Sequence, residues 1–357
     1  MTDRLGLAVV GYGMTATSHT RTFGADGHHL RWLIGRVPER AAAFANEYGY
    51  GKHGTDLEAA LNDRSVDAVI LCTPSEQHEA QALACLDAGK HVLIEIPVAM
   101  SAAGAARVAD RTRASGLSAM VAHTHRYHPG IRTAHAEIAA GRLSLSNIVA
   151  RYMFLRRENV GASGYRRSWT DNLLWHHGCH ATDLVMHLLG ASSGAQVEVA
   201  SIIATPDASV GAPLDLSIVL RTADDRLATI AMSYNAHLSR YDYVLIGRED
   251  TMEIRDGNLK ERHGVPAEVP GADTANSPSP VVLQNREFHA SILEGRPPSI
   301  SPDSVLPAME VLQIAQDAAD ALAPRQLVAR RGRSRRATAA VWFRPTGRRD
   351  RASGGRA

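Results

Sequence analysis

The 357-residue sequence has no stretch near the ~18 consecutive apolar residues that a membrane-spanning helix needs. Its first residues show no separate apolar segment followed by a cleavage site, so we expect no signal peptide and a cytoplasmic protein. Only three cysteines occur, Cys72, Cys85 and Cys179, and their wide spacing fits a reducing compartment. No Cys-x-x-Cys pair is present, which argues against a thiolate zinc site.

The composition is that of an ordinary globular protein, with 45% hydrophobic and 21% charged residues. It argues against a disordered, collagen-like or coiled-coil chain, and the length predicts two domains. Residues 325–357 hold 11 of the 39 basic and one of the 37 acidic residues, which leaves 28 against 36 in 1–324. We expect this basic tail to be a disordered, non-catalytic extension. Contact with nucleic acid is the alternative that its arginines leave open.

The first third of the chain alternates short apolar runs with helical patterns, which predicts a parallel sheet covered on both faces. We therefore expect an α/β Rossmann domain over residues 1–123. Its strands are predicted at 5–10, 29–34, 66–71, 91–96 and 117–122, and its helices at 14–25, 38–48, 75–88 and 101–115. His123 and His125 alternate with Thr124, which predicts that both lie on one face of a strand.

Longer, partly alternating segments follow, which predicts an α+β domain over residues 124–324 with a large open, mostly antiparallel sheet. Its strands are predicted at 147–156, 196–205, 214–221, 227–234 and 242–248, and its helices at 129–140, 172–189, 281–294 and 302–323. The last three strands, joined by short turns, are expected to pair in antiparallel fashion. Such a sheet suits packing against another subunit, so we expect a homo-oligomer, a dimer, formed through it.

A glycine-rich turn follows the first predicted strand. Gly11, Tyr12, Gly13, Met14 and Ala16 form Gly-x-Gly-x-x-Ala between a strand and a helix. The first glycine permits the tight turn, the second lets the backbone approach a pyrophosphate, and the small third residue lets the helix lie close to the sheet. The pattern predicts dinucleotide binding at the helix N-terminus, with a purely structural glycine turn as the alternative.

The end of the second predicted strand distinguishes the two nicotinamide cofactors. An NAD site has an acidic residue there that binds the ribose 2′-hydroxyl. This chain has Arg36 instead, with Arg40 one helical turn further on. Guanidinium groups bind phosphate, so we expect NADP, with NAD as the weaker alternative.

Together these and later motifs resemble the glucose–fructose oxidoreductase / inositol dehydrogenase / MocA family. The motifs are Gly11-x-Gly13-x-x-Ala16-x-x-His19, Cys72-Thr73-Pro74 with His78, Gly89-Lys90-His91-Val92 leading to Glu95-x-Pro97, Arg126 with Pro129, and Gly178-x-His180-x-x-Asp183. The resemblance implies a Rossmann domain plus an open-sheet domain, and oligomers formed through that sheet. Beyond the glycine turn and the two arginines, it implies cofactor contacts from Cys72, Thr73, Pro74, His78, Glu95, Ile96, Arg126 and Trp169.

Two positions depart from the family pattern. Ile96 stands where the family has a lysine that helps to polarise the reacting hydroxyl, and His176 stands where it has an aspartate. Residues 151–187 nevertheless resemble a subgroup of this family. Its members oxidise the cyclic hemiacetal of 4-carboxy-2-hydroxymuconate-6-semialdehyde to 2-pyrone-4,6-dicarboxylate with NADP⁺, in the protocatechuate 4,5-cleavage pathway. The residues that carry this likeness are Arg156-Arg157-x-Asn159, Arg167-Ser168-Trp169-Thr170-Asp171 and Leu173-Leu174-Trp175-His176-His177-x-x-His180.

The chemistry requires a group that accepts the hydroxyl proton, and histidine suits this near neutral pH. His176 and His180 are four residues apart and share one helix face, which Asp183 and His187 continue. We take His180 as the candidate base, Asp183 as its orienting group and His176 as a hydrogen-bonding partner of the reacting oxygen. A metal site on the same face is the rival interpretation, but one straight helix cannot surround an ion with four ligands.

The substrate of that subgroup carries two carboxylates, and guanidinium groups bind carboxylates well. Arg156, Arg157, Arg166 and Arg167 flank a loop at 160–165, just before the histidines. We expect substrate contacts from Arg126, Arg157, Arg167, His176, His177 and His180. Trp169 is expected either on the nicotinamide or substrate ring or in the core.

Two other functions fit the same sequence. One is an NADP-dependent dehydrogenase of another sugar-like or cyclic hydroxy compound, which would not need the arginine cluster. The other is a non-catalytic NADP-binding regulator whose basic tail contacts DNA, which the loss of the family lysine and aspartate would favour.

Overall fold

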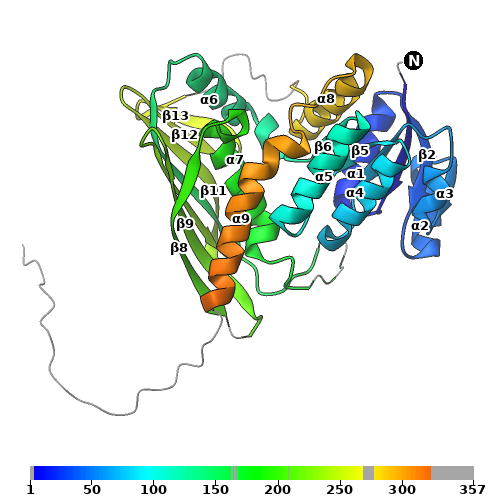
Figure 1. The fold of residues 1–357 in the computed structure, drawn as a ribbon, viewed down its shortest axis with the longest axis horizontal. Coiled ribbons are helices and arrows are strands. Elements are labelled where there is room, and N and C mark those ends of the chain that lie inside the picture. The colour runs from blue at the N-terminus through cyan, green and yellow to red at the C-terminus, as the bar shows by residue number, and fades with distance from the viewer. Residues whose placement is uncertain are drawn as a thin grey trace, which may run out of the picture. The chain divides into compact units, whose positions relative to one another are not determined.

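The computed structural model of the protein describes residues 4–161, 164, 166, 168–207, 209–267 and 277–322. The described residues belong to one compact unit, Met1–Ala323. They form two sheets that lie side by side with helices between them (Figure 1). The basic tail and the segment 268–276 lie outside the described residues.

The first sheet has six strands in the order β3-β2-β1-β4-β5-β6, all parallel. They are β1 (Gly6–Val10), β2 (His29–Ile34), β3 (Lys52–Gly54), β4 (Ala68–Leu71), β5 (His91–Ile94) and β6 (Ala119–Val121). The connecting helices are α1 (Met14–Ala25), α2 (Pro38–Tyr48), α3 (Leu57–Leu61), α4 (His78–Asp87) and α5 (Ala102–Ser115). All of β1 and β4 is buried, as a sheet covered on both faces requires, and the predicted Rossmann architecture is confirmed.

The second sheet has eight strands in the order β14-β13-β12-β11-β7-β10-β9-β8. They are β7 (Leu145–Leu155), β8 (Val197–Asp207), β9 (Ala212–Thr222), β10 (Leu227–Ser233), β11 (Asn235–Gly247), β12 (Thr251–Arg255), β13 (Asn258–Arg262) and β14 (Val265–Pro266). Every neighbouring pair is antiparallel except β7 and β10. The predicted large, mostly antiparallel sheet is therefore confirmed.

One predicted pairing in this sheet is wrong. We expected the strands at 227–234 and 242–248 to be neighbours, but β7 lies between β10 and β11. Only Tyr234 separates β10 from β11, and its backbone N–H donates to Leu214 O while its carbonyl accepts from Arg156 N. The chain thus crosses the end of β7 at this buried tyrosine instead of making a hairpin.

Helices cover one face of the second sheet. They include α6 (Pro129–Ala139), α7 (Cys179–Leu188) and α9 (Pro302–Leu322), while α8 (Pro280–Glu294) packs against α1. Helix α9 contacts α5, α7 and β8, so it lies between the two sheets (Figure 1). In the part of the chain that the structure describes, no helix is both long and apolar enough to cross a membrane.

Two local predictions near the later site also need correction. The expected strand alternation of His123 and His125 is wrong, because β6 ends at Val121 and Thr124–Tyr127 forms a 3₁₀ turn. Tight backbone bonds from His123 N to Val121 O and from Arg126 N to His123 O close this turn. The helix predicted at 172–189 is not α-helical throughout, because Leu174–Gly178 forms a π-helical turn before α7. Such turns often occur at functional sites.

Candidate active site

A pocket of about 580 Å³ lies at the carboxyl ends of the strands of the first sheet, within the usual range for small-molecule sites. One wall comes from the segments that follow β1, β2, β4 and β5, and the other from the π turn and the start of α7. The described lining residues include Gly11–Thr15, Ile34–Arg36, Arg40, Cys72–Ser75, Gln77, His78, Gln81, Glu95, Ile96, Gly161, His176, His177 and His180.

The two glycines of the turn differ in their surroundings. Gly11 has a φ of +115°, and a Cβ there would lie 2.4 Å from the carbonyl oxygen of Cys72. A Cβ on Gly13 would have no other atom within 4 Å and would stand at the wall of the pocket. Packing within the protein therefore requires glycine at position 11. At position 13, the absence of a side chain instead leaves space in the pocket for a ligand.

Helix α1 begins at this turn, with its first residues in the pocket wall. Gly13 is the N-cap with no side-chain cap bond, the first turn carries no acidic residue, and Met14 and Thr15 line the pocket. Ala16 is fully buried. A helix N-terminus with an open glycine approach binds a pyrophosphate well, so these residues fit a dinucleotide.

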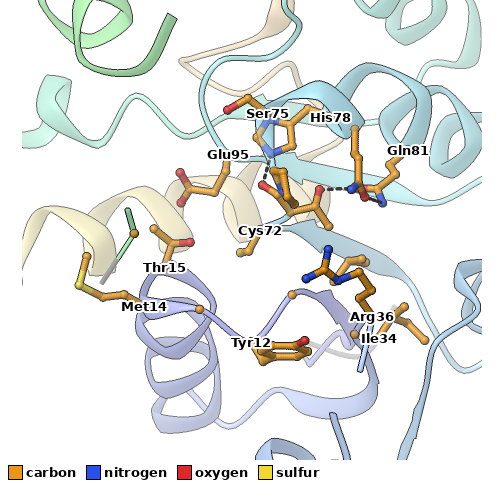
Figure 2. Close-up of a pocket in the computed structure, with 18 of the residues that line it drawn as sticks. Tyr12, Met14, Thr15, Ile34, Arg36, Cys72, Ser75, His78, Gln81 and Glu95 are labelled. Atoms are coloured by element: carbon orange, nitrogen blue, oxygen red, sulfur yellow. Dashed lines mark hydrogen bonds between the residues drawn. The ribbon is translucent and has the colours of Figure 1, made fainter. Parts of the chain in front are cut away.

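At the end of β2, the Arg36 side chain extends into the pocket (Figure 2). Arg40 places its guanidinium 5.1 Å from the centre of the Tyr12 ring, which lines the same end of the pocket. Among the lining residues that the structure describes, Glu95 is the single carboxylate, and it follows β5 rather than β2. The charge at the β2 end is thus positive.

The segments after β4 and β5 are tied together by His78. Its Nδ1 lies 2.7 Å from Pro97 O and its Nε2 lies 2.8 Å from Thr73 O, both of which are acceptors. Both ring nitrogens therefore contact backbone carbonyls, one in each segment. Burial raises the pKa of the thiol of Cys72, the residue that directly follows β4, so this pocket residue stays protonated.

Glu95 lines the pocket, and a contact with His19 fixes the position of its carboxylate. Its Oε1 lies 3.0 Å from Nε2 of His19, whose Nδ1 lies 2.9 Å from Oδ1 of Asn285. This chain joins β5 to α1 and α8. Ile96, which stands where the family pattern has lysine, also lines the pocket and offers no polar atom from its side chain.

Three histidines approach the pocket from the other side. His177 places its Nδ1 2.5 Å from the Tyr234 hydroxyl, and the His176 and His177 ring centres are 4.2 Å apart. The His180 ring stacks on His125, with centres 3.8 Å apart. Burial, with smaller contributions from His123 and His176, lowers the pKa of His180 to about 3.

The carboxylate expected to orient His180 has other partners. Asp183 is fully buried and accepts two hydrogen bonds from Arg126, with Nε to Oδ2 at 2.8 Å and Nη2 to Oδ1 at 2.5 Å. His123 Nδ1 lies 3.3 Å from its Oδ2. The structure therefore places Asp183 and Arg126 together, outside the described pocket lining, because a buried guanidinium requires a carboxylate beside it.

The other predicted substrate arginines also contact protein groups. Arg156 donates to Asn159, Arg157 to Asn235 and Arg166 to Glu158, and none of the three is among the described lining residues. Arg167 lies outside the described residues. Trp169 packs near Tyr234, with ring centres 6.3 Å apart, and is likewise absent from that lining.

The four groups of the predicted helix face do not converge on one point. His176 and His180 line the pocket, Asp183 pairs with Arg126, and His187 stacks on His135 with ring centres 4.2 Å apart. Over residues 4–322, leaving aside the undescribed positions, no three His, Cys, Asp or Glu side chains are grouped so as to hold a metal ion.

Asp171, for which the sequence predicts no role, lies against His176 in the structure. Its Oδ2 lies 3.3 Å from His176 Nδ1, and Ser75 Oγ donates to its Oδ1 at 3.3 Å. A sequence signal was present, because Asp171 belongs to the run Arg167-Ser168-Trp169-Thr170-Asp171 that carries the subgroup resemblance. The sequence could not show that the Asp171 side chain faces His176, because a residue in a loop follows no helical or strand periodicity.

Comparison with known proteins places the chain in a family. Residues 5–123 match the model of an oxidoreductase family with an NAD-binding Rossmann fold (GFO_IDH_MocA), and residues 129–270 match a bacterial oxidoreductase C-terminal domain. The 4-carboxy-2-hydroxymuconate-6-semialdehyde dehydrogenase of a Sphingobium species is 35% identical over 86% of this chain and 96% of its own length. Inositol 2-dehydrogenase 2 of Saccharopolyspora erythraea is 28% identical over 65% of this chain and 67% of its own.

Solved structures show the same fold. An oxidoreductase domain protein from Kribbella flavida superposes with a TM-score of 0.78 at 20% identity, covering 89% of this chain and 98% of that one. GenD2 from gentamicin A biosynthesis, solved in complex with NAD, gives a TM-score of 0.75 at 24% identity, covering 89% and 95%. The chain thus belongs to the glucose–fructose oxidoreductase / inositol dehydrogenase / MocA family and is an NAD(P)-dependent dehydrogenase.

Proposed function

We propose that this protein oxidises the cyclic hemiacetal of 4-carboxy-2-hydroxymuconate-6-semialdehyde to 2-pyrone-4,6-dicarboxylate, with NADP⁺ as oxidant, in the protocatechuate 4,5-cleavage pathway. The observation that carries the proposal is the 35% identity to a dehydrogenase of that substrate, which extends over nearly its whole length. The alignment covers 86% of this chain and 96% of the relative, so the resemblance is not limited to the nucleotide-binding half.

The proposed reaction removes a hydride and a proton from the hemiacetal. The C–H bond at the hemiacetal carbon breaks and its hydrogen leaves with both electrons, while the O–H bond of the same carbon breaks and its proton passes to a histidine of the pocket. A carbonyl forms, which makes the lactone. The nicotinamide, when bound, supplies the acceptor of the hydride.

A hemiacetal also suits a site without the family lysine. Its hydroxyl is more acidic than that of a sugar alcohol, so less activation is needed, and the lactone product is conjugated. Ile96 lines the pocket at the lysine position, and His176 and His180 line the same pocket. These two histidines are the candidates for handling the hydroxyl proton, His180 being the one that the sequence pattern favours.

We further propose NADP as the preferred cofactor. Arg36 extends into the pocket from the end of β2, Arg40 lines the same pocket over the Tyr12 ring, and none of the described lining residues that follow β2 directly is a carboxylate. A 2′-phosphate would meet two guanidinium groups and no like charge. The relatives with solved structures include proteins bound to NAD and to NADH, so this preference is a property to be measured on this chain.

A second candidate substrate is an uncharged cyclic hydroxy compound, such as a sugar. The observation that favours it is that Arg126, Arg156, Arg157 and Arg166 all bind protein groups rather than line the pocket. Reduction of NADP⁺ with sugars or inositol but not with the hemiacetal would support this second candidate.

We also propose that the protein forms a homodimer through the face of the second sheet that α7 and α9 leave uncovered. Ile203, Ser217, Ala231 and Arg151 are in register across four strands on that face, and Ile203 is 67% exposed. Val219, Thr229, Val149 and Val244 form the next row. Apart from Arg151, which pairs with Asp242, these are small or apolar side chains that suit burial against a second copy of the sheet.

The test is the absorbance of reduced nicotinamide after mixing enzyme, oxidised cofactor and the ring-cleavage product of protocatechuate. We expect turnover with NADP⁺ at a kcat/KM well above that with NAD⁺. Arg36→Ala should lower kcat/KM for NADP⁺ by about tenfold to a hundredfold, the value of one or two charge-assisted hydrogen bonds, and leave NAD⁺ little changed. Arg21→Ala, which removes an arginine over Tyr48 away from the pocket, is the control. No reduction of either cofactor would reject the proposed substrate.

A further inference from the structure

The two pocket histidines differ in what faces their rings. His180 stacks on His125, with an angle of 21° between the rings, and within the described chain its buried Nδ1 has no hydrogen-bond partner. His176 keeps 19% of its side chain exposed, and its Nδ1 lies 3.3 Å from the Asp171 carboxylate. A base requires both access to the substrate and a partner that stabilises its cationic form, and His176 has both.

We infer that Asp171 and His176 form the proton-accepting pair of the active site, with His176 as the catalytic residue and Asp171 as its positioning residue. This inference rests on the proposed dehydrogenase reaction. The O–H bond of the substrate breaks and an Nε2–H bond forms on His176, while Nδ1–H faces the carboxylate. Asp171 stays ionised throughout, fixes the tautomer and stabilises the imidazolium.

The Asp171 side chain is buried and fixed by a hydrogen bond, as a positioning role requires. Its side chain is only 3% exposed, and its Oδ1 accepts from Ser75 Oγ in the short turn after β4. Its own backbone carbonyl accepts from Asn159 Nδ2 at 3.0 Å, and the same amide donates to Ser168 O at 2.7 Å. The carboxylate is therefore fixed from both halves of the pocket, and it directs the ring of His176.

The helix that carries His176 is fixed in the same region. The Asn172 carboxamide oxygen accepts from Leu174 N at 2.8 Å, and Asn172 O accepts from His176 N at 3.0 Å. Gly178 ends the π turn, and a Cβ there would lie 2.9 Å from Leu173 O. Asp171 directly precedes Asn172, so its carboxylate reaches His176 in the π turn.

In this proposal His180 is a neutral hydrogen-bonding group and not the base. A proton on its ring would lie in a desolvated site against His125 and near His123, which opposes a positive charge there. As a neutral imidazole it can still exchange a hydrogen bond with the reacting oxygen. The proton then goes to His176, and the roles that the sequence pattern assigned to the two residues are reversed.

Steady-state kinetics test the pairing through a double-mutant cycle. Asp171→Asn and His176→Asn should each lower kcat by about 10²–10⁴-fold, the range of general base catalysis, with KM for NADP⁺ little changed. The double variant should be no slower than His176→Asn alone, because Asp171 acts through that ring. Asp171→Glu, which restores a carboxylate, should recover part of the turnover lost in Asp171→Asn.

The matched control is Asp250→Asn. It removes a carboxylate that lies 3.3 Å from His263, the same separation, but outside the described pocket lining, so it should leave kcat unchanged. Turnover of Asp171→Asn within about threefold of the unchanged protein would overturn the pairing. So would a loss in His180→Asn that His176→Asn does not show.

A second readout needs no substrate. In protein labelled with ¹⁵N in its histidines, the Nδ1–H signal that disappears in His176→Asn should also disappear or shift in Asp171→Asn, and persist in Asp250→Asn. A signal unaffected by Asp171→Asn would overturn the pairing even if the protein turns over no hemiacetal. Loss of the signal together with no turnover would instead reject the proposed substrate and keep the pair.

Discussion

The guanidinium of Arg126 and the carboxylate of Asp183 form a bidentate, buried pair that joins the turn after β6 to helix α7. The sequence pattern suggested that Arg126 contacts ligands and that Asp183 orients a catalytic histidine. In the structure both residues lie outside the described pocket lining, and their contact joins segments 57 residues apart. Burial raises the pKa of Asp183, but Arg126 and His123 together outweigh it and hold this pKa below its usual value.

Breaking this pair should destabilise the fold more than it changes binding. Asp183→Asn leaves a buried guanidinium without its counter-charge, so we expect a loss of about 3–5 kcal/mol in the free energy of unfolding. Urea unfolding measures it. Asp225→Asn, which breaks the exposed pair with Arg221, should cost about 1 kcal/mol or less. Equal losses in the two variants would show that the buried pair is not structural.

Acid should unfold the protein through its buried histidines. Burial is the largest cause that lowers the pKa of four of them from about 6.5 to about 4 or 3: His28, His123, His180 and His187. Below pH 6.5 the unfolded chain binds these protons and the folded chain does not. Stability is therefore complete above pH 6.5 and falls as the pH drops toward about 4, by about 1.4 kcal/mol per pH unit for each group.

The proton linkage can be measured as the slope of the unfolding free energy against pH between 6.5 and 4.5. His187→Asn should lower this slope by about one proton, because it removes one of the four groups. A slope near zero in the unchanged protein would contradict the neutral, buried state of these rings.

The two glycines of the turn should separate folding from binding. Gly11→Ala places a Cβ 2.4 Å from Cys72 O at a positive φ, so we expect a clearly lower melting temperature. Gly13→Ala places its Cβ in open space and should fold normally, yet weaken NADPH binding by about tenfold or more because the dinucleotide needs that space. Thermal unfolding and a fluorescence titration with NADPH measure the two effects. Unchanged NADPH affinity in Gly13→Ala would place the cofactor elsewhere.

The uncovered face of the second sheet should carry the subunit contact. Ile203 is largely exposed and lies in register with Ser217 and Ala231, so Ile203→Glu should leave the fold intact and convert a dimer into monomers. Light scattering after size exclusion gives the mass of each variant. Leu238→Glu, a change at another exposed apolar residue, outside that row, is the control. A monomeric unchanged protein would contradict the proposed dimer.

Continuous burial explains why the first sheet was predictable. Its strands β1 and β4 are apolar and buried at every position and are followed by helical segments, so hydrophobic runs and turn residues define them without any knowledge of contacts. β3 and β13, with the sequences KHG and NLKER, carry no such signal and were missed. The crossover at Tyr234 was missed as well, because strand order depends on packing rather than on local sequence.

In the pocket too, residues placed by the strand that precedes them were predictable, whereas contacts between separate segments were not. Gly11, Gly13 and Arg36 line it because they follow strands whose positions were predictable. The partners of Arg126 and His176 come from segments 57 and 5 residues away, and ion pairs between segments have no periodicity in the sequence. The sequence therefore suggested candidate residues, while the tertiary structure determines which of them lie in contact.

The most direct test of the central claim is to follow the transferred hydrogen. Substrate labelled with deuterium at the hemiacetal carbon is mixed with the enzyme and NADP⁺, and the reduced cofactor is examined by NMR. The account predicts one deuterium at C4 of the nicotinamide ring, in equal amount with 2-pyrone-4,6-dicarboxylate. Unlabelled NADPH, or no reduction of the cofactor with this substrate, would contradict it.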